Sequence, residues 1–93
     1  MKKFEVLDFY AEWCGPCRAM SPTIAKLMEE MNVEGSEVEI KKVDVDKDPE
    51  LTSKFGIRSI PTLIFLKEGE EAERLNGAVS RDKILKTLEQ IAA

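Results

Sequence analysis

The chain has 93 residues, of which 43% are hydrophobic and 34% charged, and its net charge is −4. We expect a single domain over residues 1–93, because this length is enough to fold alone. The acidic balance and the lack of a basic cluster argue against nucleic acid as the main partner. No apolar stretch is long enough to span a membrane, and nothing at the N-terminus resembles a signal peptide. We therefore expect a cytoplasmic protein without a membrane partner.

The first half of the chain predicts a strand, a long helix and a second strand. Residues 4–10 alternate as a strand does, which places Asp8 on one face together with the apolar side chains of Phe4, Val6 and Tyr10. From Gly15 to about Met31 the apolar positions recur at helical spacing, so one stripe of this helix faces a core. Residues 38–45 form the next predicted strand, in which Lys42 stands among inward-facing positions.

The second half predicts a short helix, a hairpin and a last helix. Asp48 is a typical N-cap for a helix that stops at Gly56. Residues 63–66 are continuously apolar, as in a central strand, and the polar residues 70–75 suggest an edge strand. Ser80 can cap the final helix. The order predicts an α/β fold with a four-stranded mixed sheet (β-α-β-α-β-β-α) and helices on both faces.

The two cysteines of the chain, Cys14 and Cys17, flank Gly15 and Pro16 where the long helix begins. A thiol at a helix N-terminus is close to unpaired backbone N–H groups and to the positive end of the helix dipole, and both favour the thiolate. Gly15 allows a substrate to approach closely, and Pro16 suits the first helical position. Cys17 lies one turn inside the helix and is expected to be the more buried thiol. The pattern predicts a redox-active pair at the carboxyl end of the first strand, where open α/β sheets usually bind ligands.

Other interpretations of the cysteines are open. A structural disulfide that closes so short a loop removes little entropy from the unfolded chain. A structural zinc ion needs four ligands, whereas the chain has two cysteines and no histidine, so a metal would have to be shared between chains. We therefore expect no metal site and no cofactor besides the cysteine pair itself. The alternative of a different class is a redox-inactive binding module.

Three motifs follow one another along the chain: residues 11–17 (AEWCGPC), residues 42–46 (KVDVD) and residues 55–62 (FGIRSIPT). In these motifs the chain resembles the thioredoxin family, although typical thioredoxins begin with an extra strand and helix, and Tyr10 stands where many have Trp. The resemblance implies the thioredoxin fold and a thiol-disulfide oxidoreductase, an electron carrier that reduces protein disulfides. Within the same chemistry, the alternatives are a glutaredoxin-like protein reduced by a low-molecular-weight thiol, and a disulfide isomerase or oxidase.

The resemblance also implies roles for individual residues. Cys14 would attack a substrate disulfide as the thiolate, and Cys17 would resolve the mixed disulfide. Asp8 matches the buried aspartate that serves as general base for Cys17, with Lys42 beside it, and burial of a carboxyl group raises its pKa towards neutrality. Pro61 matches the cis-proline that faces the cysteines.

The substrate-binding rim implied by the resemblance consists of Trp13, Gly15, Pro16, Ile60, Pro61, Gly77 and Ala78. The implied partners are disulfide-containing protein substrates and an upstream disulfide reductase similar to thioredoxin reductase. We expect the protein to act as a monomer.

Overall fold

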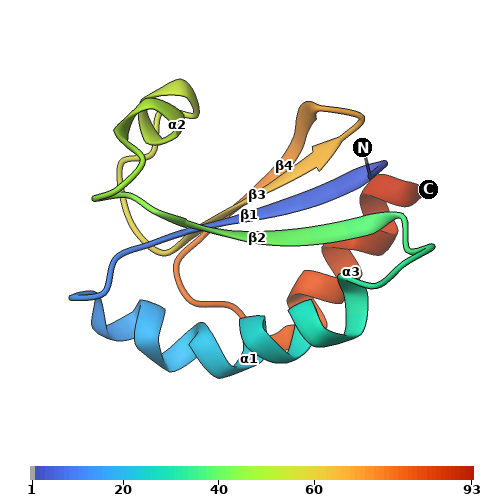
Figure 1. The fold of residues 1–93 in the computed structure, drawn as a ribbon, viewed down its shortest axis with the longest axis horizontal. Coiled ribbons are helices and arrows are strands. Elements are labelled where there is room, and N and C mark those ends of the chain that lie inside the picture. The colour runs from blue at the N-terminus through green and yellow to red at the C-terminus, as the bar shows by residue number, and fades with distance from the viewer. Residues whose placement is uncertain (1) are drawn as a thin grey trace.

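The computed structural model describes residues 2–93 (Figure 1). Its strands and helices follow in the predicted order, with only small shifts in their end points. They are β1 (Phe4–Tyr10), α1 (Gly15–Met31), β2 (Val38–Asp44), α2 (Pro49–Lys54), β3 (Thr62–Lys67), β4 (Glu70–Asn76) and α3 (Arg81–Ala92).

The strands form one sheet in the order β2-β1-β3-β4. β1 is parallel to β2 and antiparallel to β3, and β3 is antiparallel to β4. The predicted four-stranded mixed sheet is therefore confirmed, with β4 at an edge. β1 is paired on both sides, and the register places Asp8 between Lys42 of β2 and Leu63 of β3.

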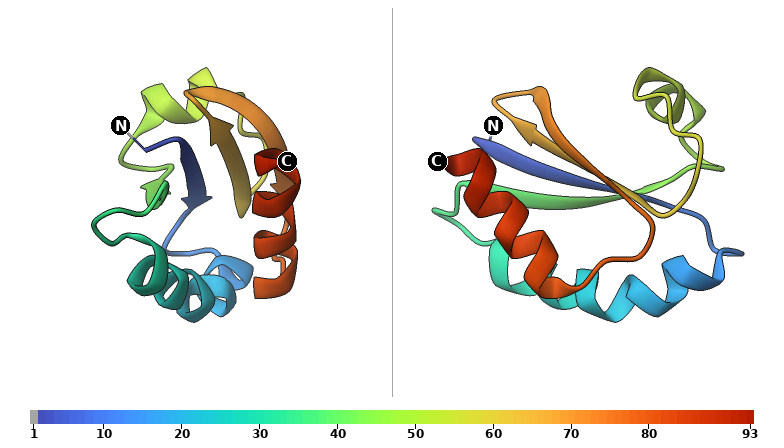
Figure 2. Two further views of the ribbon diagram at one scale, coloured as in Figure 1. Left: turned by 90° about the vertical axis from the view of Figure 1, so that its right-hand side faces the viewer. Right: turned by 180° about the vertical axis from the view of Figure 1, so that it is seen from behind.

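Helices α1 and α3 cover one face of the sheet, and α2 covers the other (Figures 1 and 2). The larger core lies under α1 and α3 because the apolar stripes of these helices meet the alternate inward-facing residues of the strands. Its buried members are Phe4, Val6, Met20, Ile24, Leu27, Ile40, Leu63, Phe65, Ile84 and Leu88. On the α2 face the buried members are Leu7, Phe9, Val43, Ile64 and Leu66.

Side chains cap α2 and α3 as the sequence predicts. The Leu51 N–H donates to Asp48 Oδ1 at 3.0 Å, and the Lys83 N–H donates to Ser80 Oγ at 3.2 Å. Each bond satisfies one backbone donor that has no partner inside the first turn of a helix.

The outer edge of β2 is covered by two side chains. The Ile40 N–H donates to Asn32 Oδ1 at 2.7 Å, and Asn32 Nδ2 donates to the Ile40 carbonyl at 2.8 Å. Ser36 Oγ accepts from the Val38 N–H at 3.1 Å and donates to the Val38 carbonyl at 3.2 Å. Because β2 has β1 as its single neighbour in the sheet, these contacts satisfy backbone groups that a further strand would otherwise pair with.

Candidate active site

Cys14 and Cys17 are joined as a disulfide at the start of α1, with their Cα atoms 5.2 Å apart. Cys14 is the N-cap residue of α1, and its Sγ accepts a hydrogen bond from the Cys17 N–H at 3.2 Å. Pro16 lies in the first turn, where its missing N–H costs no hydrogen bond. The structure thus places the pair where the helix dipole and the free N–H groups stabilise a thiolate.

The expectation that Cys17 is the more buried cysteine is wrong. Both cysteines have an exposed fraction of 5%. The segment after β1 folds back, with the Cys14 N–H donating to the Ala11 carbonyl at 3.2 Å, so that Cys14 packs into the same small cluster as Cys17 and Ala11. Ile60 is packed against this cluster from the loop before β3.

Two of the expected rim residues, Ile60 and Gly77, lie next to Pro61. The Ile60–Pro61 peptide bond is cis, as the resemblance implied. The Gly77 N–H donates to the Pro61 carbonyl at 2.8 Å, which joins the loop after β4 to the proline. Trp13 and Ala78 are exposed, Trp13 by 68% of its surface. An exposed tryptophan next to the disulfide leaves an apolar surface open to a partner.

Asp8 is buried under α1, as the strand alternation predicted. Its exposed fraction is 3%, and its Oδ1 has no hydrogen-bond partner among the described residues. Burial raises the pKa of Asp8 from its ordinary value of 3.8 to about 6, while the nearby Lys42 ammonium opposes the increase. The carboxyl group therefore changes its charge much closer to neutral pH than an exposed aspartate does.

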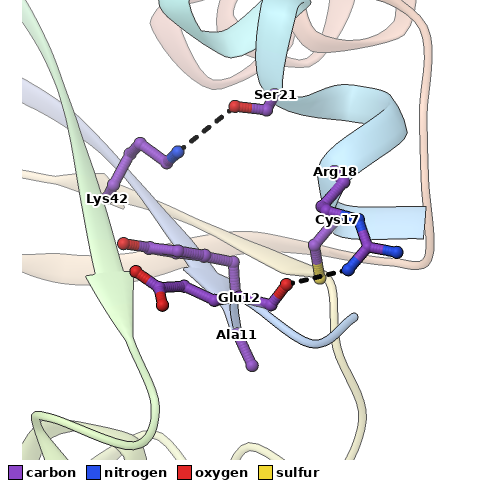
Figure 3. Close-up of a pocket in the computed structure, with 7 residues that line it drawn as sticks. Ala11, Glu12, Cys17, Arg18, Ser21 and Lys42 are labelled. Atoms are coloured by element: carbon purple, nitrogen blue, oxygen red, sulfur yellow. Dashed lines mark hydrogen bonds between the residues drawn. The ribbon is translucent and has the colours of Figure 1, made fainter. Parts of the chain in front are cut away.

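Lys42 reaches from β2 towards α1 rather than closing an ion pair with Asp8. Its Nζ lies 4.4 Å from the centroid of the Tyr10 ring and donates to Ser21 Oγ at 3.4 Å (Figure 3). Within residues 2–93, no carboxylate oxygen lies within 4.0 Å of this ammonium. Lys42 is thus a cation beside the site that lowers the pKa of Asp8 from a distance.

Two contacts near the disulfide were not predicted from the sequence. The Trp13 Nε1–H donates to Asp46 Oδ2 at 2.9 Å, across 33 positions in the chain. Arg18 Nη1 donates to the Glu12 carbonyl at 3.0 Å and so ties the loop before the cysteines to α1. The sequence offered no signal for either contact, because both depend on how the loop folds back onto other elements.

Residues 2–93 contain no group of three or more His, Cys, Asp or Glu side chains placed to hold a metal ion. Over the same range, no helix combines the length and the apolar character that crossing a membrane requires.

Comparison with known sequences identifies relatives along most of the chain. The family model "Thioredoxin" matches residues 1–90. A thioredoxin of Pyropia yezoensis is 40% identical over 83 residues, which cover 89% of this chain and 75% of the relative. A thioredoxin of Chlamydia muridarum is 41% identical over 83 residues, covering 89% of this chain and 78% of the relative.

Solved structures agree with the sequence relatives. The thioredoxin of Fasciola hepatica superposes with a TM-score of 0.82 at 39% identity and covers 96% of this chain and 82% of its own. Mitochondrial thioredoxin 3 of Saccharomyces cerevisiae, in its oxidised form, gives a TM-score of 0.81 at 30% identity, covering 97% of this chain and 80% of its own. The chain therefore belongs to the thioredoxin family, and with its Cys14–Cys17 pair it is a thiol-disulfide oxidoreductase that reduces protein disulfides.

Proposed function

We propose that this protein is a cytoplasmic monomer that carries electrons from an upstream reductase, similar to thioredoxin reductase, to disulfide-bonded proteins. The observation that carries the proposal is the disulfide at the N-terminus of α1, in a chain that also holds a buried carboxyl group with a raised pKa, that of Asp8. Members of the thioredoxin family generally reduce disulfide substrates and are themselves reduced by thioredoxin reductase, which supports both partners.

The proposed reaction moves two electrons through the cysteine pair. In the reduced protein, the Cys14 thiolate attacks one sulfur of the substrate disulfide, and the other substrate sulfur leaves as a thiolate. Cys17 then loses its proton and attacks Cys14 Sγ. The bond between Cys14 and the substrate breaks, the second substrate thiolate leaves, and the Cys14–Cys17 disulfide forms. The substrate is reduced and the protein is oxidised.

Asp8 is the proposed acceptor of the Cys17 proton. A base works best when its pKa is near the working pH, and the pKa of about 6 meets this condition. Asp8 Oδ1 accepts no hydrogen bond from the residues that the structure describes, which supports its role as the acceptor of that proton. We assign Lys42 a positioning role, because its charge limits how far burial raises the pKa of Asp8 and so keeps the carboxylate available at neutral pH.

The proposed substrate-binding rim surrounds the disulfide, and the backbone before Pro61 would pair with an extended substrate segment as an added strand does. Packing of Ile60 against the cysteines and the bond between Gly77 and Pro61 support this placement. The remaining rim residues are Trp13, Gly15, Pro16 and Ala78, all exposed.

The reduction potential of the Cys14–Cys17 pair tests the direction of electron flow. We expect a value near the thioredoxin figure of about −270 mV when the protein is equilibrated with defined dithiol buffers. A potential above about −200 mV would assign the protein to oxidation or isomerisation instead. Efficient reduction by a thioredoxin reductase, but not by glutathione alone, is the expected result for the electron donor.

The role of Asp8 is tested on the resolving step. We expect the release of substrate from a mixed disulfide with Cys14 to slow as the pH falls below about 6, where Asp8 gains a proton. Asp8→Asn should slow this step by roughly 10²-fold and remove the pH dependence near 6. Asp82→Asn, at an exposed position of α3, is the control. If Asp8→Asn keeps the rate and the pH profile of the parent protein, Asp8 is not the proton acceptor.

A further inference from the structure

The segment between β2 and β3 carries part of the proposed substrate-binding rim. It leaves β2, forms α2 and returns to the sheet after the cis bond at Pro61 (Figure 1). Residues 45–60 include no fully buried side chain, so this segment is attached to the sheet from one side only. We call residues 56–61 the rim loop, because Ile60 and Pro61 belong to the expected rim. The position of the rim loop depends on what holds its two ends.

The end of the rim loop at Pro61 is anchored on β4. The Gly77 N–H donates to the Pro61 carbonyl at 2.8 Å, and Thr62 Oγ1 donates to the Ser59 carbonyl at 2.7 Å. Thr62 is itself buried, and its Oγ1 lies 3.2 Å from Asn76 Oδ1. Asn76 is the last residue of β4, and Gly77 follows it. The end of β4 therefore fixes the residues on both sides of Ile60.

The other end of the rim loop is held by one side chain of the same strand. Arg74 Nη2 donates to the Phe55 carbonyl at 2.6 Å, across 19 positions in the chain. The register pairs Arg74 with Ile64, which is buried on the face that α2 covers, so the arginine lies on that face too. Phe55 is the C-cap residue of α2, where carbonyl groups have no partner inside the helix. A cation is a favourable donor at this end of a helix.

A neighbouring carboxylate orients the Arg74 guanidinium. Arg74 Nε lies 2.9 Å from Glu71 Oε2, and Arg74 Nη2 lies 2.9 Å from Glu71 Oε1. Such a bidentate pair fixes the plane of the guanidinium as well as its position. Glu71 thus limits the directions in which Arg74 can donate, and the Phe55 carbonyl lies in one of them.

The apolar contacts of the segment hold it less specifically. The centroid of the Phe55 ring lies 5.9 Å from that of Phe9. Hydrophobic burial has no preferred direction and tolerates sliding, whereas a hydrogen bond requires a defined distance and angle. Among residues 2–93, Arg74 is the one side chain from outside residues 44–62 that hydrogen-bonds to residues 47–58. This single bond therefore sets where the rim loop begins.

We propose that Arg74 is a positioning residue for the reduction of protein disulfides, because it holds the rim loop in the conformation that accepts a protein substrate. β4 would then fix both ends of the loop, through Arg74 at Phe55 and through Gly77 at Pro61. The inference rests on the proposed substrate-binding rim and adds a residue that lies outside it. A loop that is held for only part of the time gives a proportionally weaker apparent affinity.

The reduction of insulin, whose chains are joined by disulfides, tests this role with dithiothreitol as the source of electrons. Arg74→Met keeps an apolar stem and removes the donors. It should raise the KM for insulin by roughly 5-fold, as for a loop that is competent about a fifth of the time, and leave kcat unchanged. Arg74→Lys keeps a cationic donor and should stay within roughly 2-fold of the parent protein. The small disulfide dithiobis(nitrobenzoate) has no extended segment to bind, so all three proteins should reduce it at the same rate.

Two further variants serve as control and second test. Arg81→Met is the matched control, because Arg81 also pairs with one carboxylate, that of Glu30, but belongs to α3. Its KM for insulin should equal that of the parent protein, and an increase equal to that of Arg74→Met would contradict the proposal. Glu71→Gln leaves Arg74 in place without its carboxylate partner and should raise the KM less than Arg74→Met does. This variant keeps the test usable if Arg74→Met does not fold.

Motion of the rim loop is measured without any substrate, so it remains readable if the proposed rim is wrong. NMR relaxation on the ps–ns and μs–ms timescales should show added motion at the amides of residues 57–60 in Arg74→Met and none in Arg81→Met. Unchanged motion in Arg74→Met would overturn the proposal, because Arg74 would not hold the loop. Added motion with an unchanged KM would also overturn it, because the loop would then not bind the substrate. An equal loss of rate with insulin and with dithiobis(nitrobenzoate) would place the effect at the cysteines instead.

Discussion

The two ends of the sheet face under α1 and α3 differ in whether their polar groups are hydrogen-bonded. Where β1 begins, Phe4 and Val6 pack into the larger core, and Asn32 and Ser36 satisfy the outer edge of β2. Towards the end of β1, Asp8 is buried as deeply as its apolar neighbours, yet its Oδ1 has no hydrogen-bond partner within residues 2–93. One end of the sheet thus has its edge groups on β2 satisfied, whereas the other end holds an unsatisfied side-chain atom on β1.

The difference indicates that the packed end contributes most to stability, whereas the end with Asp8 lowers it. A buried polar atom without a partner lowers the stability of the folded state, so most proteins avoid it. In this chain the atom belongs to Asp8, the proposed proton acceptor, and the fully packed end of the same face offsets the cost. Substitutions at the two ends should therefore have opposite effects on the free energy of unfolding.

The largest effect is expected at the packed end. Phe65 is fully buried on β3, opposite Val6. Phe65→Ala should lower the free energy of unfolding by about 3–5 kcal/mol, because the cavity cannot collapse between the sheet and two helices. Urea unfolding measures this loss. Val33→Ala, at a position with an exposed fraction of 48%, is the control and should change the free energy by about 0.5 kcal/mol or less.

At the end of the face that holds Asp8, a substitution is expected to raise the free energy of unfolding rather than lower it. Between pH 3.8 and about 6 the folded protein holds a proton on Asp8 more firmly than the unfolded chain does, so stability falls as the pH rises through this window. Above about pH 6 the loss of folding stability caused by the buried Asp8 charge levels off at about 3 kcal/mol, because each pKa unit between 3.8 and about 6 corresponds to ~1.4 kcal/mol. Asp8→Asn should remove this cost and stabilise the protein at pH 8 by up to that amount.

Unfolding curves of the parent protein and Asp8→Asn at a series of pH values measure this effect. The gain should shrink as the pH decreases and vanish below about pH 4, where Asp8 is protonated in both states. A gain of the same size at every pH would mean that packing or hydrogen bonding of the amide, rather than the charge of Asp8, is responsible.

A smaller effect is expected where Asn32 covers β2. Asn32→Ala removes both hydrogen bonds to Ile40 and should lower the free energy of unfolding by about 1–2 kcal/mol. It also exposes backbone groups that can pair with another chain, so the apparent mass in sedimentation should increase with concentration. Glu34→Ala, in the same exposed loop, should leave both measurements unchanged.

The smallest effect is expected for the ion pair that joins α1 and α3 at the surface. Arg81 Nη2 lies 2.5 Å from Glu30 Oε1, and both side chains are partly exposed. Arg81→Ala should cost less than about 1 kcal/mol, and the cost should decrease as salt is added, because water and ions screen such pairs. A loss comparable to that of Phe65→Ala would show that the helices depend on this pair and not on the core.

The elements of the fold could be predicted because they follow from local pattern. Alternation placed Asp8 on the covered face, and the side-chain chemistry of Asp48 and Ser80 marked where two helices begin. The two cysteines identified the reactive site at once, because their spacing brings them together on the first turn of a helix. The cis bond before Pro61 was expected from the family resemblance, since local pattern alone does not distinguish it from a trans bond.

The contacts that cross the fold could not be predicted. The sequence predicts that Asn32 ends a helix. Its two hydrogen bonds to the Ile40 backbone depend on where β2 returns beside that helix, which the local pattern does not show. The equal burial of the cysteines depends on the path of the loop from Ala11, and the position of Lys42 depends on Tyr10 and Ser21 beside it. Such contacts are decided by tertiary packing, which a linear pattern does not encode.

The bond between Trp13 and Asp46 gives the protein an optical reporter of its own chemistry. Trp13 is the sole tryptophan of the chain, so all indole emission originates one residue away from Cys14. A disulfide quenches a neighbouring excited indole more strongly than two thiols do, and the carboxylate at 2.9 Å holds the ring in a defined orientation. The redox state of the cysteine pair can therefore be followed by intrinsic fluorescence, without a label and without altering either sulfur.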